Sequence, residues 1–294
     1  MKRKIIKSLV FVMIFSFLIG CSSTEKIKSK EQNSKTNNNN MTEETEMEKT
    51  TYILFIGNSY TYYNDMPTSL FKNIAESAGI NVDVSAITKG GYRLSQHANP
   101  EDEYGKKVEE ALTGNKKYDY VILQEQSLLP AYDNPPTFYD AVRNLSNRIK
   151  KNGATPILYS TWGRKSGHTA LESNGWTNES MTWRLAASYQ AIGDELDITV
   201  AHAGLAFYDV YTNNTDIELY NIDLTHPSRA GSFLAAATLF AKIFNFDVTQ
   251  LNYTAGFSSD DAKIIYNAAK KAAFNTPIIP AEYKKISQNV TNNG

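Results

Sequence analysis

The sequence predicts an α/β fold in which one parallel, five-stranded sheet is covered by helices on both faces. Five apolar segments of strand length alternate with helical segments along the 294 residues. The first of these, TYILFIG at 51–57, lacks the alternation of a half-exposed strand, which indicates burial on both faces. Right-handed crossovers leave few topologies, and a flavodoxin-like strand order, 2-1-3-4-5, fits best.

The first half of the chain is expected to contain three strands and two helices. The helix that follows the first strand has apolar residues at helical spacing, with Pro67 near its start and Gly79 at its stop. The expected elements are a strand at 51–57, a helix at 67–79, a strand at 80–87, a helix at 103–112 and a strand at 118–124.

The second half continues the same alternation. A long polar loop is expected at 163–179, and an acid-capped helix closes the domain. The expected elements are a helix at 137–151, a strand at 154–162, a helix at 181–196, a strand at 197–204 and helices at 228–244 and 259–274.

The N-terminus has the pattern of an exported protein. Basic residues within MKRKIIK precede an apolar stretch at 9–20, which is short for a membrane span. The following LIGC sequence looks like a bacterial lipobox, and Cys21 is the only cysteine in the chain. This resemblance implies cleavage before Cys21 and attachment of lipid, such as palmitate, to that residue. The alternatives are an ordinary secretory signal and an uncleaved anchor.

Four stretches of different character therefore follow one another. We expect a lipoprotein signal peptide at 1–20, the lipidated cysteine and a disordered linker at 21–50, a folded domain at 51–285 and a C-terminal tail at 286–294. The linker is rich in Ser, Asn, Lys and Glu and has too few large apolar residues for a core. The expected location is the cell envelope, outside the cytoplasm and anchored to a membrane by lipid. Net charge is −1, which gives no basic surface for nucleic acid.

Candidate catalytic residues follow the carboxyl ends of the predicted strands. Ser59 follows the first strand, and Asp223 and His226 follow the fifth in the sequence NIDLTHPS. A serine hydroxyl becomes a good nucleophile when a base removes its proton, and imidazole titrates near neutral pH. Three residues of separation let the Asp223 carboxylate reach Nδ1 of the same histidine. The non-catalytic alternative is that Ser59 caps a helix and that Asp223 and His226 are ordinary turn residues.

An acyl-transfer reaction also needs donors for the developing oxyanion. The candidates are the N–H groups of Ser59 and Gly91 and a side-chain amide from Gln124 or Gln126. Both glutamines lie on the same side of an extended segment, which leaves the choice between them open.

These residues together resemble the SGNH (GDSL-like) hydrolase superfamily over residues 52–244. FIGNSYT stands where the family has Gly-Asp-Ser, Gly91 matches its oxyanion glycine, and IDLTHPS matches its Asp-x-x-His block. The resemblance implies a three-layer α/β/α fold and ester hydrolysis by a Ser-His-Asp triad without metal or cofactor.

The sequence departs from the family at two places. Asn58 replaces the aspartate before the nucleophile, and LQEQS replaces the Gly-x-Asn-Asp block after the third strand. This segment is more similar to the Gln-Gly-Glu-Ser segment of the carbohydrate acetylesterase branch, which favours Gln124 as the donor, with Gln126 second. Glu125, between them, is expected to be a solvated or salt-bridged loop charge.

The function expected from these features is an extracytoplasmic serine esterase that removes O-acetyl or other short acyl groups from a carbohydrate. A non-catalytic glycan-binding lipoprotein on a degenerate scaffold and an acyltransferase of the same fold are the alternatives. Trp162, Trp176 and Trp183 flank the long loop, where they either pack it or form a sugar platform; packing is favoured.

Overall fold

The computed structural model describes residues 49–133, 135–214 and 216–285. These residues belong to one compact unit, Met47–Gly294. The predicted signal peptide, Cys21, nearly all of the predicted linker and the predicted tail at 286–294 lie outside the described residues, so the proposed domain boundaries stay predictions.

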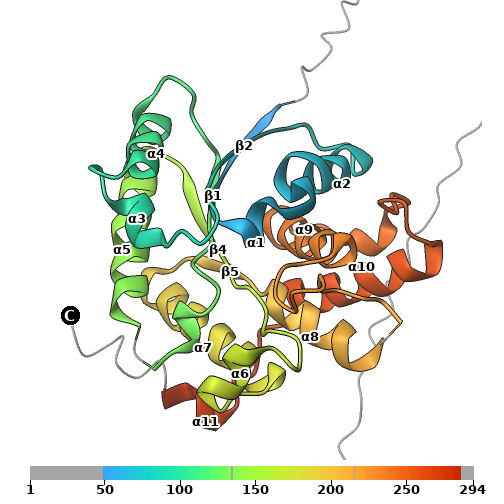
Figure 1. Ribbon diagram of the computed structural model, residues 1–294. Coiled ribbons are helices and arrows are strands. Elements are labelled where there is room, and N and C mark those ends of the chain that lie inside the picture. Colours follow the sequence, from blue (N-terminus) through green and yellow to red (C-terminus); the bar gives the residue numbers. More distant parts are fainter. Residues whose placement is uncertain (1–48, 134, 215, 286–294) are drawn as a thin grey trace, which may run out of the picture. The chain divides into compact units, whose positions relative to one another are not determined.

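Five parallel strands form one sheet in the order β2-β1-β3-β4-β5 (Figure 1). The predicted strand order is therefore confirmed. The strands are β1 (Thr51–Gly57), β2 (Val82–Thr88), β3 (Tyr120–Leu123), β4 (Thr155–Tyr159) and β5 (Thr199–Ala201).

Helices fill most of the intervals between strands. They are α1 (Ser59–Tyr62), η1 (Tyr63–Asp65), η2 (Met66–Phe71), α2 (Lys72–Ser77), α3 (Leu94–Ala98), α4 (Glu103–Thr113), η3 (Leu129–Ala131), α5 (Pro136–Lys151), α6 (Thr169–Asn174), α7 (Asn178–Leu196), α8 (Ala203–Asn213), α9 (Arg229–Phe244), η4 (Val248–Gln250), α10 (Ser259–Phe274) and α11 (Ala281–Lys284).

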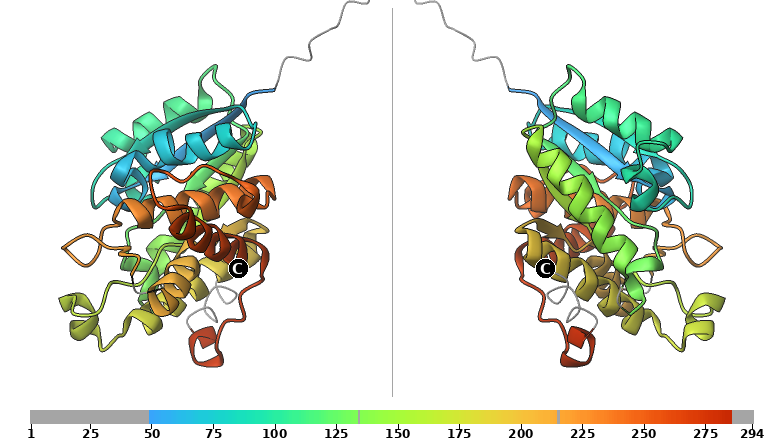
Figure 2. Two further views of the ribbon diagram at one scale, coloured as in Figure 1. Left: turned by 90° about the vertical axis from the view of Figure 1, so that its right-hand side faces the viewer. Right: turned by 90° about the vertical axis from the view of Figure 1, so that its left-hand side faces the viewer.

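Strand β1 is buried on both sides because its side chains alternate between two hydrophobic clusters. Ile53 and Phe55 pack with residues of η2, α2, α8, α9 and α10. Leu54 and Ile56 pack with residues of α3, α4, α5 and α7 on the opposite face. Figure 2 shows α10 in front of the sheet in one view and α5 in the other. The result is the three-layer α/β/α arrangement that the resemblance implied.

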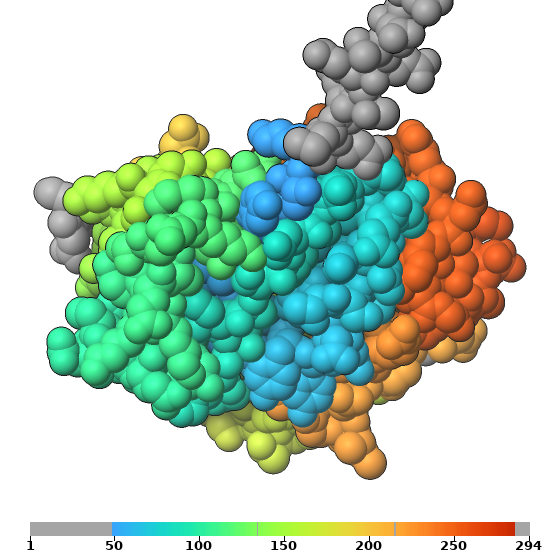
Figure 3. All heavy atoms as spheres, turned by 90° about the horizontal axis from the view of Figure 1, so that it is seen from above, coloured from blue at the N-terminus to red at the C-terminus, as the bar shows by residue number. Residues whose placement is uncertain are grey.

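The view from above shows how these layers flank the first strand (Figure 3). The α3–α5 side, in green, and the α9–α10 side, in orange, lie on opposite sides of the segment that contains β1 and α2. Helix α9 is buried along nearly its whole length, because its residues are apolar or small on every side.

The structure differs from the sequence expectation at two short helices. The interval 163–179, expected to be a polar loop, contains α6, and α3 follows β2. The N-cap of α6 is His168, whose Nδ1 accepts from the Ala170 N–H, rather than the usual serine or aspartate. The helix expected at 67–79 consists of the π-helix η2 followed by the α-helix α2.

Candidate active site

Ser59 lies at the carboxyl end of β1, as the first residue of α1. The preceding Asn58 caps this helix, because its side-chain oxygen accepts from the Tyr60 N–H at 3.2 Å. The amide nitrogen of Asn58 donates to the Tyr92 carbonyl at 2.9 Å. An aspartate could not make this second bond. Asn58 therefore connects the turn that contains Ser59 to the loop after β2.

Asp223 and His226 lie in one tight turn before α9. One oxygen of Asp223 accepts from the N–H groups of Thr225 at 3.0 Å and His226 at 2.9 Å, and the other contacts His226 Nδ1 at 2.5 Å. Leu224, between them, has φ +60°, in the left-handed region that bulky residues avoid. The carboxylate thus fixes both the turn and the ring.

The structure brings the three predicted triad residues together. His226 Nε2 lies 2.8 Å from Ser59 Oγ. Because Nδ1 faces a carboxylate, it carries the ring proton, and Nε2 is left to accept the proton of the serine. The Tyr63 ring stacks on His226, with centroids 4.2 Å apart and planes 8° apart. The geometry matches the requirement for an activated serine.

The carboxyl group of Asp223 is ionised at neutral pH. Burial alone would raise the pKa of Asp223, but hydrogen bonds from the His226 ring and from the backbone N–H groups of His226 and Thr225 lower that pKa below its ordinary value. The negative charge needed beside the imidazole therefore persists at neutral pH.

Two backbone N–H groups are available for an oxyanion. Within the described part of the chain, neither the Ser59 N–H nor the Gly91 N–H has a hydrogen-bond acceptor. Both residues line the same cavity of about 190 Å³. Gly91 has φ +72°, which glycine adopts without strain. The positions of both donors agree with the predicted roles, which stay predictions.

The structure places Gln124 away from the cavity, contrary to the sequence preference for it as the side-chain donor. Gln124 is fully buried, and its side-chain oxygen accepts from the Asn58 N–H at 2.9 Å and from Thr61 Oγ1 at 2.8 Å. Its amide nitrogen donates to the Glu125 carbonyl. Gln124 does not line the cavity. These bonds satisfy the polar groups of the buried amide and hold the turn that contains Ser59 in place.

Gln126 is the glutamine that lines the cavity. Its side-chain oxygen accepts from the N–H groups of Leu128 and Leu129, each at 3.0 Å. These two backbone donors fix the orientation of the amide, because only its oxygen can accept from them. The amide nitrogen is then the end of the side chain that is free to donate, which makes Gln126 the candidate oxyanion donor.

Glu125 is also placed differently from the sequence expectation. It is fully buried rather than solvated, and its carboxylate accepts from the N–H groups of Leu94 at 3.1 Å and Gln126 at 2.5 Å. Burial raises the pKa of Glu125 to about 7, although these backbone bonds act in the opposite direction. Glu125 therefore links the start of α3 to the residue that carries the candidate donor.

Three side chains converge on Thr225, which lies between Asp223 and His226. The Tyr60 hydroxyl is 2.5 Å from Thr225 Oγ1, and Arg164 donates to the same oxygen. Trp162 Nε1 donates to the Thr225 carbonyl at 3.1 Å. The turn with the base is thereby attached to residues that follow β1 and β4.

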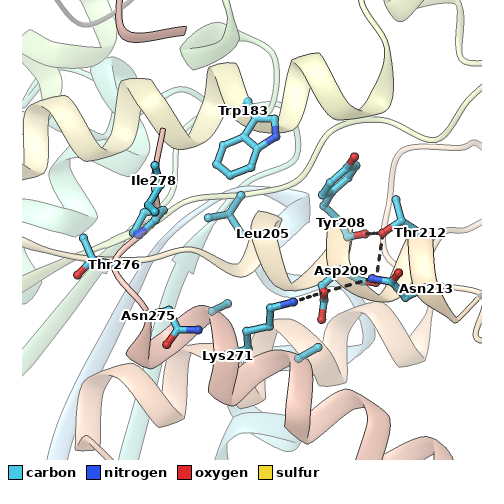
Figure 4. A pocket seen from close by; sticks show the side chains of 13 residues that line it. Trp183, Leu205, Tyr208, Asp209, Thr212, Asn213, Lys271, Asn275, Thr276 and Ile278 are labelled. Carbon is cyan, nitrogen blue, oxygen red and sulfur yellow. Dashed lines mark hydrogen bonds and ion pairs between the residues drawn. The ribbon is translucent and has the colours of Figure 1, made fainter. Parts of the chain in front are cut away.

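Two of the three tryptophans pack against other aromatic rings. Trp162 is fully buried, between Tyr60 and Phe207, with centroids 4.7 Å and 3.9 Å away. Trp176 packs against Tyr132. A separate cavity of about 410 Å³, lined by Trp183 and by residues of α8 and α10, contains none of the candidate catalytic residues (Figure 4).

Two residues of this site, Arg164 and Thr225, are not among those predicted from the sequence. Arg164 follows β4, and Thr225 stands inside the Asp-x-x-His block. The rule that pointed to Ser59 and His226, which is to examine residues just past the carboxyl ends of parallel strands, would also have selected Arg164. Arg164 lies in a stretch that is expected to be a polar loop, where a charged side chain gives no signal of a functional role.

Among the described residues there is no group of three or more His, Cys, Asp or Glu side chains that could hold a metal ion. In the same residues, no helix has both the length and the apolar character needed to cross a membrane.

Comparison with known proteins identifies the family. A solved structure from Slackia heliotrinireducens, described as an SGNH hydrolase, has 33% sequence identity and a TM-score of 0.57, and the match covers 66% of this chain and 100% of that chain. The chain therefore belongs to the SGNH hydrolases.

Other similarities are more distant. A DUF4886 family protein from Bacteroides uniformis has 20% identity and a TM-score of 0.63, over 76% of this chain and 95% of that chain, which shows the shared fold. An acetylxylan esterase from Geobacillus stearothermophilus has 16% identity and a TM-score of 0.48, over 69% and 98%, too low to indicate a substrate. No protein-family model and no curated protein matches the sequence.

Proposed function

We propose that this hydrolase is a serine esterase that removes O-acetyl or other short acyl groups from a carbohydrate. One observation carries the catalytic part of the proposal: Ser59 Oγ, His226 and Asp223 form a continuous chain of contacts of 2.8 Å and 2.5 Å at the edge of a cavity. The carbohydrate part rests on the sequence, which suggests a surface-tethered protein.

The proposed reaction has two steps. Ser59 Oγ attacks the ester carbonyl while His226 Nε2 takes its proton, and the oxyanion accepts from the N–H groups of Ser59 and Gly91 and the amide of Gln126. Collapse releases the alcohol, which takes the proton from His226, and leaves an acyl group on Ser59. Water, deprotonated by His226, then releases the acid and restores the serine.

The size of the cavity supports a short acyl group. Its volume of about 190 Å³ is below the ~300–1,000 Å³ of typical small-molecule sites. A long acyl chain would have to extend out of it.

The direct test is hydrolysis of p-nitrophenyl acetate and of acetylated sugars by wild type and Ser59→Ala. We expect activity in wild type, loss in Ser59→Ala, and no change in Ser173→Ala, which alters an exposed serine on α6. Wild-type rates equal to the buffer rate on all these esters would refute the proposal.

A fluorophosphonate probe separates the esterase from the glycan-binding alternative. Covalent labelling requires an activated serine, so wild type should be labelled and Ser59→Ala should not. Unlabelled wild type that still binds glycan would favour the binding protein. Products formed with an acceptor sugar would distinguish an acyltransferase from a hydrolase.

The proposed location is the cell envelope, with the enzyme held to a membrane through lipid on Cys21. The supporting observation is the LIGC sequence after a short apolar stretch. Several acyl chains on one cysteine would anchor the protein firmly, since each buried CH₂ contributes about 0.8 kcal/mol. Incorporation of a palmitate analogue into wild type but not into Cys21→Ser would support this location, and equal incorporation would refute it.

A further inference from the structure

We propose that Arg164 binds a carboxylate carried by the substrate close to the scissile ester. The substrate class would then be an anionic ester: either the acyl half or the alcohol half bears the carboxylate. The inference rests on the proposed esterase function and adds a specificity residue to it.

Arg164 belongs to the cavity of the candidate triad. It lines this cavity together with Ser59 and His226, yet only 8% of its surface is exposed. Its main chain is fixed, because Asn178 Nδ2 donates to its carbonyl at 2.8 Å and its own N–H contacts Met181 Sδ at 3.4 Å. The guanidinium is thus held at the site by the fold.

The partners of the guanidinium are all uncharged. Arg164 donates to Thr225 Oγ1 and to Ser127 Oγ, the latter at 3.1 Å, and contacts His168 Nε2 at 3.4 Å. Burial, and then the charge of Arg164, lower the pKa of His168, which keeps that ring neutral. The buried Nε of Arg164 has no hydrogen-bond partner in the part of the chain that the structure describes.

The charge of Arg164 has no ion-pair partner among the described carboxylates. Within the described residues, no Asp or Glu lies within ion-pair distance of Arg164. The two acids of the site are already engaged, Asp223 with His226 and Glu125 with backbone N–H groups. Leaving a buried charge unpaired is costly, so such a site favours an anionic ligand.

A carboxylate fits this arrangement better than a neutral group. Arginine presents five N–H donors in a planar fork, and only two of them are used, on Thr225 and Ser127. His168 accepts none, because its Nδ1 accepts from the Ala170 N–H and its Nε2 therefore carries the ring proton. The carboxylate could come from a dicarboxylic half-ester, such as a succinyl group, or from a uronic acid that carries the acyl group. Both sources place a negative charge within a few bonds of the carbonyl that Ser59 attacks.

A purely structural role for Arg164 makes a different prediction. If Arg164 only steadied Thr225 and the turn of the base, its replacement would lower kcat for charged and neutral esters equally. If it binds a carboxylate, its replacement changes the ratio of the two. The ratio therefore distinguishes the two roles.

The experiment compares matched pairs of esters, with buffer hydrolysis subtracted. The acyl arm uses p-nitrophenyl monosuccinate against p-nitrophenyl valerate, and the alcohol arm uses acetylated methyl glucuronoside against acetylated methyl glucoside. Charge-assisted hydrogen bonds of this kind correspond to roughly 10- to 100-fold in kcat/KM. We expect a preference of this size for the anion in one arm, which identifies the half that carries the charge.

Variants then link the preference to Arg164. Arg164→Gln should remove the preference mainly through KM, and Arg164→Lys should restore part of it. Arg143→Gln, which removes a surface arginine paired with Asp140 and Glu195, should leave the ratio unchanged. If Arg164→Gln does not fold, a protection experiment on the wild type tests the role of Arg164. Succinate or glucuronate should slow fluorophosphonate labelling of Ser59 more than a neutral analogue does.

The outcomes separate this inference from the proposed function. If wild type hydrolyses the neutral esters with no preference in either arm, the role of Arg164 is refuted and the esterase stands. If it hydrolyses none of the four esters and is not labelled, the esterase itself fails. A preference that survives in Arg164→Gln also refutes the inference.

Discussion

Replacing Glu125 by glutamine should flatten the pH dependence of stability. The pKa of Glu125 is raised from 4.5 to about 7 because the carboxyl group is buried. The folded state therefore binds the proton more tightly than the unfolded state does. The stabilisation is complete below pH about 4.5 and is lost as pH rises through about 7.

The size of this effect follows from the difference between the two pKa values. At about 1.4 kcal/mol for each pH unit, the wild type loses about 3 kcal/mol from this carboxyl group between acid and slightly alkaline pH. Glutamine does not titrate, and its side-chain oxygen can still accept from Leu94 and Gln126. The variant should therefore gain stability relative to wild type as pH rises.

The measurement is urea unfolding followed by circular dichroism at a series of pH values that spans this window. A matched control is Glu103→Gln, because the salt bridge to Lys107 lowers the pKa of that exposed carboxyl group and reverses the sign of its effect. Parallel stability curves for Glu125→Gln and wild type across the whole series would refute the reasoning, since they would show that Glu125 titrates normally.

Three further outcomes test the site and its support. Gln126→Ala should lower kcat by about 10²–10³-fold with little change in melting temperature. Gln124→Ala should instead lower the free energy of unfolding by about 1–3 kcal/mol. Equal losses of kcat in both variants would contradict the choice of Gln126 as the oxyanion donor. Asp223→Asn should lower kcat by about 10⁴-fold, as loss of the correct tautomer does in serine proteases, and a variant that keeps most of its activity would argue against the triad. Gly57→Ala should destabilise the fold by about 1–3 kcal/mol, because its Cβ would lie 2.5 Å from Thr61 Oγ1 and 2.7 Å from the Gln124 side chain; an unchanged urea midpoint would show that these side chains move aside.

The fold could be predicted from sequence because its strands are marked by composition. The apolar segment TYILFIG coincides with β1, since a strand buried on both faces is apolar throughout. Helix α6 has no clear signal in the sequence, because it is short and its N-cap is His168, which sequence rules do not recognise as a cap. Such helices depend on tertiary contacts rather than on a local pattern.

The site was predictable to the extent that strand ends point to one edge of the sheet. That rule brought Ser59 and His226 together, but it could not orient the amides. Gln124 and Gln126 have the same side-chain chemistry and differ only in which backbone groups surround them. Glu125 looks like a loop charge in sequence, and only the N–H groups that it accepts from show that it is buried.

The three contacts on Thr225 imply that the proposed reactivity of Ser59 exists only in the native state. Ser59 and His226 are 167 positions apart in sequence and meet through a turn that Tyr60, Trp162 and Arg164 hold in place. An unfolded chain, or one in which this turn has opened locally, has an ordinary serine. Labelling of Ser59 by a fluorophosphonate therefore measures the fraction of molecules in which the segments after β1, β4 and β5 are docked, and it should fall before the helical circular dichroism signal does during denaturation.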